Sequence, residues 1–243
     1  MMASAVAASL LDESEVALFG CAIAALRDRG IPFLVVGAHA VYQYTGVWRN
    51  TKDLDLAIVP GDRKAAVETL RDLGLNDYFV VEAYDQEWIF RAHAGSVIVD
   101  LIWMFANKVA RVSADWFRRA RPGWLAGEAA RFAAPEDLIW MKLMVLQRGR
   151  CDWPDLLNII RGTHGRLDWQ LLLANVGPHW PLLRALIQVY DWLCPAEHSF
   201  IPAPFRAILE ERARAMLPGG ELCRAALLDW RPWLAAPGEG ALS

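Results

Sequence analysis

The 243-residue sequence predicts an α+β (α/β) fold, with a β-sheet flanked by helices in the first half of the chain and a helical C-terminal half. Short apolar runs bounded by Gly and Pro, such as residues 33–36, alternate with amphipathic segments up to about residue 104. Strand-like runs fade beyond that point, and Pro and Gly separate a series of helical segments. Because 55% of the residues are hydrophobic and 22% are charged, the chain can bury a large core.

In the first half, helices and strands follow one another closely. An amphipathic helix at 13–29 ends at Gly30, a residue suited to a helix C-terminus, and a buried strand at 33–36 ends at Gly37. The elements expected next are a helix at 38–44, a strand at 53–59, a helix at 62–73, and strands at 78–83, 87–92 and 96–103. The turn at Ala94-Gly95 predicts that the last two strands form a hairpin.

The second half is expected to be helical. Pro135 suits the first turn of a helix, and Gly149 is expected to stop that helix. The predicted helices span 136–147, 154–161, 168–174, 182–194, 204–217 and 220–230. The stretch 121–127, which contains Pro and Gly, is the predicted linker, so we expect two domains, 1–125 and 126–243.

Charge and cysteine content exclude several classes of protein. With 25 Lys and Arg against 28 Asp and Glu, the chain lacks the basic surplus of a dedicated DNA-binding protein. Its four scattered cysteines form no C-x-x-C motif, which is typical of a reducing compartment. The first residues lack the positive charges of a signal peptide, and the longest apolar stretch, 16–26, is too short for a membrane span. We therefore expect a soluble, cytoplasmic protein.

Two aspartates of the strand at 53–59 are the leading candidates for a catalytic site. Strand side chains alternate between faces, so Asp53 and Asp55 share one face while Leu54 and Leu56 point into the core. Neighbouring carboxylates raise each other's pKa unless a cation neutralises them. Mg²⁺, which binds one or two carboxylates together with substrate phosphates, is the simplest such cation. Two solvated aspartates on an exposed face are the plain alternative.

Asp100 is the only charged residue in the apolar run 97–103. A carboxylate inside a strand core is costly unless it is paired or bound to a metal. If its strand neighbours that of Asp53 and Asp55, the three carboxylates can hold two metal ions, which is an arrangement that serves phosphoryl-type displacement. A structural salt bridge from Asp100 to an Arg or Lys is the alternative.

The turn at Gly37 is a candidate phosphate-binding site. A glycine between a strand and a helix lets phosphate oxygens approach the backbone N–H groups of the helix N-terminus, although it can equally serve the turn alone. Arg49 offers a planar fork suited to phosphate, or is an exposed residue at the entry of the strand. His39, beside the turn, is expected to be structural, with a substrate contact as the alternative.

These segments together resemble the nucleotidyltransferase superfamily, which has the DNA polymerase β-like fold. The resemblance covers residues 31–104 and is carried by Val35-Val-Gly37-Ala-His39-Ala-Val41 and by Arg49-x-Thr51-x-Asp53-Leu-Asp55-Leu. It implies a small mixed β-sheet with Asp100 as the third acidic residue. The R-x-T-x-D-x-D form is similar to the bacterial branch that includes the AbiEii-like and MenT-like toxins. The sequence departs from the family at Ala38, where a second Gly or Ser is usual, so a hydroxyl that could touch phosphate is absent.

A second segment is similar to the same branch. It runs from Pro135-Glu-Asp-Leu-Ile-Trp-Met-Lys142 to Arg148, Asp152 and Asp155. The resemblance implies that Lys142 meets the triphosphate. From the residues alone, Lys142 can also extend its ammonium group to the surface, Asp152 can cap a helix, and Asp155 can face the helix dipole. Arg148 either pairs with these aspartates or contacts substrate.

The resemblance implies an enzyme that transfers a nucleoside monophosphate from an NTP to an acceptor and releases pyrophosphate, with Mg²⁺ or Mn²⁺ as cofactor. Asp53, Asp55 and Asp100 would be the catalytic and metal-binding residues, and the nucleotide would be bound by Gly37, Ala38, Arg49, Thr51 and Lys142. The resemblance does not distinguish between tRNA, protein and a small molecule as the acceptor. The arginine-rich stretch 111–131 is either a basic groove for tRNA or a solvated face. The alternative function is a weak or inactive protein of this fold that binds an antitoxin-like partner.

Overall fold

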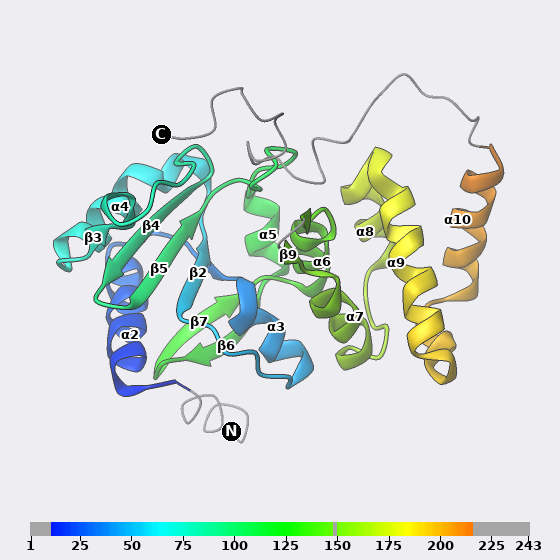
Figure 1. The fold of residues 1–243 in the computed structure, drawn as a ribbon, viewed down its shortest axis with the longest axis horizontal. Helices are drawn as coiled ribbons and strands as arrows, with labels where there is room; N and C mark the ends of the chain where they lie inside the picture. The colour runs from blue at the N-terminus through cyan, green and yellow to red at the C-terminus, as the bar shows by residue number, and fades with distance from the viewer. Residues whose placement is uncertain (1–10, 148–149, 216–243) are drawn as a thin grey trace, which may run out of the picture. The chain divides into compact units, whose positions relative to one another are not determined.

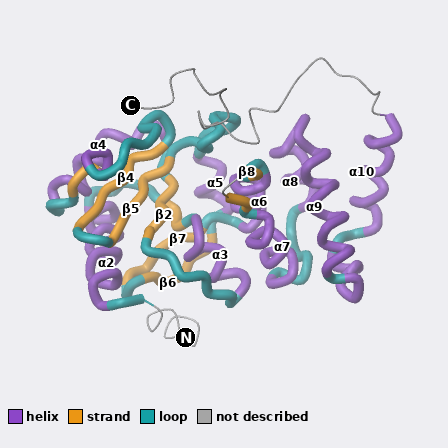
Figure 2. The backbone as a smooth tube through the Cα atoms, in the orientation of Figure 1, coloured by secondary structure: helices purple, strands orange, loops and turns teal. Residues whose placement is uncertain are grey.

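The structure, a computed structural model, describes residues 11–147 and 150–215 (Figures 1 and 2). The chain divides into two compact units, Met1–Leu138 and Ile139–Ser243. The sequence predicts a division after residue 125, but this position lies in the turn of a hairpin within the first unit. The predicted linker 121–127 holds strand β6 (Arg121–Leu125), which pairs with β7 (Glu128–Phe132), so a cut there would split a sheet.

The first unit is a mixed seven-stranded sheet with helices, as the sequence predicts. Its strands have the order β3-β4-β5-β2-β1-β7-β6. The remaining strands are β1 (Leu34–Val35), β2 (Asp53–Ala57), β3 (Asn76–Asp77), β4 (Ile89–Ala94) and β5 (Val97–Ile102). The helices are α2 (Glu13–Asp28), α3 (Gly37–Thr45), α4 (Arg63–Asp72) and α5 (Ala114–Arg119), and α6 (Pro135–Leu143) begins in this unit.

The centre of the sheet brings strands from distant parts of the sequence together. β2 runs parallel to β5 and antiparallel to β1, and β4 and β5 form the predicted antiparallel hairpin. Helix α2 starts with a capping box, in which the Asp12 side chain accepts from the Glu15 backbone N–H while the Glu15 side chain accepts from that of Asp12. It packs with α4 against β5 (Figure 1). The opposite face of β2 and β5 is thereby left to polar side chains.

Two segments of the first unit differ from the sequence prediction. The strand expected at 78–83 is a 3₁₀ turn, Tyr78–Val80, because the Asp77 side chain accepts a hydrogen bond from the Phe79 backbone N–H and ends β3. The second segment is β6, which lies in the predicted linker 121–127. β6 contains Pro122 and lies at the edge of the sheet, where a residue without a backbone N–H is tolerated.

The second unit is mainly helical, as expected. It contains the end of α6, a small β8–β9 ladder (Leu146–Gln147 and Arg150–Cys151), and the helices α7 (Trp153–Gly162), α8 (Trp169–Val176), α9 (Trp180–Leu193) and α10 (Ala203–Ala215). Helix α6 ends at Leu143 rather than at 147, because the chain turns into β8. The predicted helix at 220–230 and the residues Arg148 and Gly149 lie outside the described residues. Within the described ranges, no helix has the length and apolar character needed to cross a membrane.

Candidate active site

The three predicted catalytic carboxylates lie on neighbouring strands of the first unit. On β2, Leu54 and Leu56 are fully buried, whereas Asp53 and Asp55 are half-buried on the other face, as the alternation of the strand predicts. The parallel pairing of β2 with β5 sets Asp55 directly opposite Asp100. The structure therefore brings Asp53, Asp55 and Asp100 together on one face of the sheet.

The Gly37 turn lies against the Asp55 carboxylate. Gly37 has φ +62°, and a Cβ atom at this position would lie 1.8 Å from Asp55 Oδ2. The backbone N–H of Val36, next to the turn, donates to the Asp55 carbonyl at 3.0 Å. Only glycine can occupy this position without displacing the carboxylate. Ala38 follows in the first turn of α3, so the start of that helix and the carboxylates share one small region.

Arg91 on β4, which the sequence analysis did not select, occupies the centre of this region. It lies directly opposite Asp100 in the β4–β5 register. Its Nε donates to Asp100 Oδ1 at 3.0 Å and its Nη2 donates to Asp100 Oδ2 at 2.7 Å. Nη2 is also 3.5 Å from Asp53 Oδ2. The salt bridge considered as the alternative for Asp100 is thus present, and its cation is Arg91.

Burial and charge together set the protonation of Asp100. Burial raises the pKa of Asp100 to about 7, the hydrogen bonds from Arg91 oppose this shift, and the negative charge of Asp55 adds to it. An opposing cation and two neighbouring carboxylates thus act on one buried group.

His39 is a buried residue beside the Gly37 turn. Its ring is 3% exposed and lies 5.6 Å from the rings of both Phe19 and Trp48. Burial lowers the pKa of His39 to about 4, and a hydrogen bond to the Asp53 backbone offsets part of this shift. The imidazole is therefore neutral at pH 7. Its Nε2 is buried and has no hydrogen-bond partner among the residues that the structure describes.

Arg49 and Thr51 lie on the segment that leads into β2. The Thr51 hydroxyl accepts a hydrogen bond from the Asp53 backbone N–H at 3.4 Å, which holds the start of the strand. Arg49 is exposed. Their contact with a phosphate group stays a prediction.

Lys142 lies in the second unit and is buried in an ion-pair cluster. Its Nζ donates to Asp152 Oδ2 at 2.7 Å and to Asp155 Oδ2 at 2.9 Å, and Arg150 donates two further hydrogen bonds to Asp152. Burial raises the pKa of Asp152, but Arg150 and Lys142 outweigh it and lower that pKa to about 2. Lys142 does not extend to the surface, and Asp152 stands at the N-cap of α7 without a side-chain capping bond. The predicted contact of Lys142 with a triphosphate stays a prediction.

Comparison with known proteins decides the family. A family model described as an uncharacterised nucleotidyltransferase matches residues 8–200. The chain belongs to this nucleotidyltransferase family. No curated protein matches the sequence.

Several solved structures are similar to the nucleotidyltransferase. The antibiotic-resistance factor ANT(2″)-Ia, in complex with adenylyl-2″-tobramycin, is 19% identical with a TM-score of 0.43, over 82% of this chain and 99% of that one. The lincosamide antibiotic adenylyltransferase LnuA is 15% identical with a TM-score of 0.44, over 61% and 96% of the two chains. JHP933 from Helicobacter pylori is 12% identical with a TM-score of 0.44, over 84% and 97%. We draw neither substrate nor mechanism from likenesses this distant.

The candidate site contains carboxylate oxygens that could bind a metal ion, and the Arg91 guanidinium lies among them. Three carboxylates on adjacent strands are the hard oxygen ligands that Mg²⁺ and Mn²⁺ take, and the Gly37 backbone approaches the Asp55 carboxylate closely. Among the described residues, however, no group of three His, Cys, Asp or Glu side chains is arranged to hold a metal ion. Arg91 lies between the carboxylates and takes both oxygens of Asp100.

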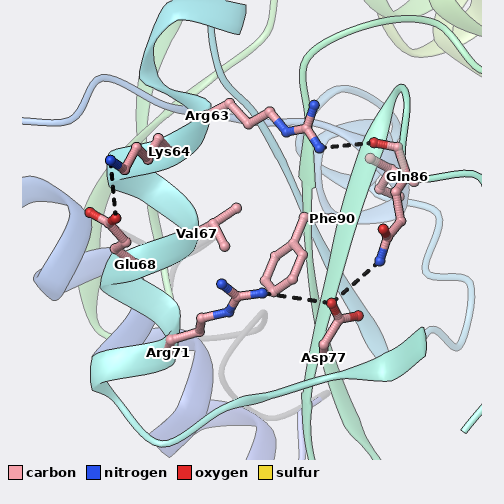
Figure 3. Close-up of a pocket in the computed structure, with 9 residues that line it drawn as sticks. Arg63, Lys64, Val67, Glu68, Arg71, Asp77, Gln86 and Phe90 are labelled. Atoms are coloured by element: carbon pink, nitrogen blue, oxygen red, sulfur yellow. Dashed lines mark hydrogen bonds and ion pairs between the residues drawn. The ribbon is translucent and has the colours of Figure 1, made fainter. Parts of the chain in front are cut away.

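A separate hollow of about 330 Å³ lies on the other face of β4 (Figure 3). Helix α4 supplies one wall, and Phe90 of β4 faces it, with the Arg71 guanidinium 5.4 Å from the Phe90 ring. Phe90 precedes Arg91 in the strand, so the two side chains point to opposite faces of the sheet. None of the predicted site residues lines this hollow.

Proposed function

We propose that this nucleotidyltransferase is metal-dependent and transfers a nucleoside monophosphate from an NTP to an acceptor, with release of pyrophosphate. The close approach of Gly37 to Asp55 is the observation that carries the proposal. It sets a helix N-terminus, suited to phosphate, against carboxylates that are suited to a divalent cation. Phosphoryl chemistry depends mainly on positioning and on electrostatic stabilisation, both of which such a site supplies.

The residues of the first unit divide between phosphate and metal. The backbone N–H groups of Gly37 and Ala38 would bind phosphate oxygens, with Arg49 and Thr51 as further phosphate contacts from the entry of β2. Asp53 and Asp55 would hold the divalent ion, and Asp100 completes the carboxylate set. When bound, the ion would neutralise charge on the phosphates during transfer.

The acceptor is proposed as tRNA, protein or a small molecule, and the arginine-rich stretch weighs against tRNA. Arg119 pairs with the buried Asp137 at 2.6 Å, and Arg131 donates to the backbone carbonyls of Phe117 and Ala120. Arg118 pairs with Asp115. Arg119 and Arg131 thus hold parts of the first unit together, whereas Arg118 is exposed, so fewer of the arginines face a nucleic acid.

The test is pyrophosphate release from each of the four NTPs with Mg²⁺ or Mn²⁺, using acceptors of the three classes. Asp53→Asn and Asp55→Asn are expected to lower the rate by about a thousandfold, because a bound ion contributes several kcal/mol to such reactions. Asp72→Asn is the control, since Asp72 is an exposed partner of Arg29. Calorimetry measures NTP binding in parallel. If the wild type binds no nucleotide and neither variant changes the result, the proposal is overturned. Tight binding to an antitoxin-like protein would then support the partner-binding alternative.

A further inference from the structure

The hollow between helix α4 and strand β4 receives two arginines and one aspartate (Figure 3). Arg63 and Arg71 extend from α4 toward β4, and Asp77 of β3 lies across from Arg71. The other charged pair of the lining, Lys64 and Glu68, lies on the outer side of α4. Positive charge thus exceeds negative charge inside the hollow, which favours an anionic ligand. Its volume of about 330 Å³ is sufficient for a small molecule.

The ion pair inside the hollow is a weak one. Arg71 Nη2 lies 3.8 Å from Asp77 Oδ2, which is beyond the length of a hydrogen bond, and the Arg71 side chain is 57% exposed. By contrast, Arg91 Nη2 donates to the buried Asp100 at 2.7 Å. A long ion pair at the surface contributes little to stability. An anion that binds Arg71 therefore displaces only a weak contact.

Asp77 does not depend on Arg71 for its hydrogen bonds. Its Oδ1 accepts from the Phe79 backbone N–H at 2.9 Å and from the Tyr84 hydroxyl at 2.8 Å. Its Oδ2 accepts from the Gln86 side-chain amide at 3.4 Å. When Arg71 turns to a ligand, the Asp77 carboxylate therefore stays hydrogen-bonded.

Aromatic rings hold both guanidinium groups at the hollow. The guanidinium carbon of Arg63 lies 4.4 Å from the centre of the Trp103 ring, and that of Arg71 lies 5.4 Å from the centre of the Phe90 ring. Arg63 also donates to the Gln86 backbone carbonyl at 3.3 Å. The planar fork of a guanidinium matches the oxygens of phosphate or carboxylate. Two such groups are thus held at the edge of one hollow.

An apolar floor lies between the two arginines. Arg63, Val67 and Arg71 are spaced by four residues, so their side chains follow one face of α4. Val67 points across the hollow toward Phe90, which is buried (Figure 3). A ring placed on Val67 and Phe90 would remove apolar surface from water while its anionic group contacts an arginine.

We propose that this hollow binds a small aromatic phosphate monoester, with its ring on Val67 and Phe90 and its phosphate on the arginines. Phosphate is favoured over carboxylate because its two negative charges and three terminal oxygens can bind more than one guanidinium. The hollow lies on the face of β4 opposite to Arg91 and the candidate active site. The proposed binding is therefore independent of nucleotide transfer.

The first experiment titrates the full chain with three probes in a calorimeter, at about pH 8, where a phosphate monoester carries close to two negative charges. Phenyl phosphate is expected to bind about tenfold more tightly than inorganic phosphate, because its ring covers the apolar floor. It is expected to bind about tenfold more tightly than benzoate, which has the ring but only one negative charge. If phenyl phosphate binds no more tightly than inorganic phosphate, or than benzoate, the proposal is overturned.

Two variants locate the bound probe. Arg63→Met and Arg71→Met each remove one guanidinium and are expected to weaken phenyl phosphate binding by about tenfold. Arg161→Met is the matched control, because Arg161 is 54% exposed but donates three hydrogen bonds to Glu197. In the wild type, the Nε–H nuclear magnetic resonance signals of Arg63 and Arg71, assigned by their loss in the two variants, are expected to shift with phenyl phosphate. Unshifted signals, or an affinity in Arg71→Met equal to that of Arg161→Met, would refute the site.

Val67→Glu tests the hollow with both arginines in place. The new carboxylate is four residues from Arg63 and from Arg71, so it can pair with either of them and occupy the hollow. The melting temperature should not fall, and phenyl phosphate should bind at least about a hundredfold more weakly. Val67→Gln, which has the same shape without the charge, is the control and should stay within about fivefold of the wild type. Equal affinities of Val67→Glu and Val67→Gln for phenyl phosphate would contradict the proposal.

Discussion

Each unit of the nucleotidyltransferase pairs a buried aspartate with cations, but the number of cations differs between the two units. In the first unit, Asp53, Asp55 and Asp100 surround Arg91. In the second, two cations, Lys142 and Arg150, match two carboxylates, Asp152 and Asp155. Asp100 thus meets one cation with two further carboxylates nearby, whereas Asp152 meets two cations.

The two buried aspartates show the consequence of this difference. Burial raises the pKa of Asp100 to about 7, because one guanidinium does not offset both burial and two neighbouring carboxylates. Burial also raises the pKa of Asp152, yet two cations lower it to about 2. The cations that meet a buried carboxylate thus decide whether its pKa lies above or below its usual value.

The largest effect is expected from removing Lys142, a buried cation of the cluster in the second unit. Lys142→Met should lower the free energy of unfolding by about 3–5 kcal/mol, because it leaves buried carboxylates with too little positive charge. Urea denaturation measures this. Lys64→Met is the control, since Lys64 is 89% exposed and its pair with Glu68 is expected to contribute less than about 1 kcal/mol. Equal losses for the two variants would contradict a structural role for the cluster.

Substitution of two glycines with positive φ is expected to have different consequences: Gly165 is needed for stability, and Gly37 for metal binding. Gly165 has φ +66°, and a Cβ atom there would lie 1.7 Å from the Phe200 carbonyl oxygen. Gly165→Ala should therefore cost about 3 kcal/mol, since a backbone atom must move. The atoms nearest to a Cβ in Gly37→Ala belong to the Asp55 side chain, which can rotate, so its cost in stability should be smaller, at about 1–2 kcal/mol. Gly37→Ala should instead weaken Mn²⁺ binding. Unchanged Mn²⁺ affinity in this variant would remove the link between the turn and the carboxylates.

Metal rescue distinguishes the two cations directly. Without metal, Arg91→Met should lower the free energy of unfolding by about 2 kcal/mol, less than Lys142→Met because the Arg91 side chain is 30% exposed. Saturating Mn²⁺ should restore the melting temperature of Arg91→Met, since the ion replaces the lost charge. It should not restore Lys142→Met. If Mn²⁺ restores the melting temperature of both variants, or of neither, the two clusters do not differ in metal binding.

A pH dependence of about the same size as the effect of Arg91→Met belongs to the second unit. The folded-state pKa of Asp152 lies below its usual value of 3.8, so the stabilisation it provides is present above pH 3.8 and is lost as the pH falls to about 2. About 2 kcal/mol should disappear over this window. Asp152→Asn should flatten the change in the free energy of unfolding between pH 4 and pH 2. A slope identical to that of the wild type would show that Asp152 is not responsible.

Part of the site could be predicted because it depends on local patterns. The alternation of β2 predicts that Asp53 and Asp55 share a face, and the burial of Leu54 and Leu56 confirms it. The β4–β5 hairpin was predicted, but its register was not. A turn at Ala94-Gly95 would set Arg91 opposite Ile98, whereas the turn lies at Gly95-Ser96 and sets Arg91 opposite Asp100.

Other parts were not predictable from local patterns. β6 reads as a loop because it contains Pro122 and Gly123, and only its place at the edge of the sheet makes it a strand. Lys142 suggested either a surface amine or a phosphate contact, because the sequence does not show that Asp152 and Asp155 come back to it across β8 and β9.

By itself, the sequence determined which residue types are available and which share a strand face, because the period of a strand is a property of the local backbone. It therefore determined the glycine turn, the paired aspartates and the third carboxylate as candidates. Only the tertiary structure decided which cation each buried carboxylate meets. That choice depends on the pairing of strands distant in the chain and on burial, which makes an unpaired charge costly and so selects Arg91 for Asp100 and Lys142 for Asp152.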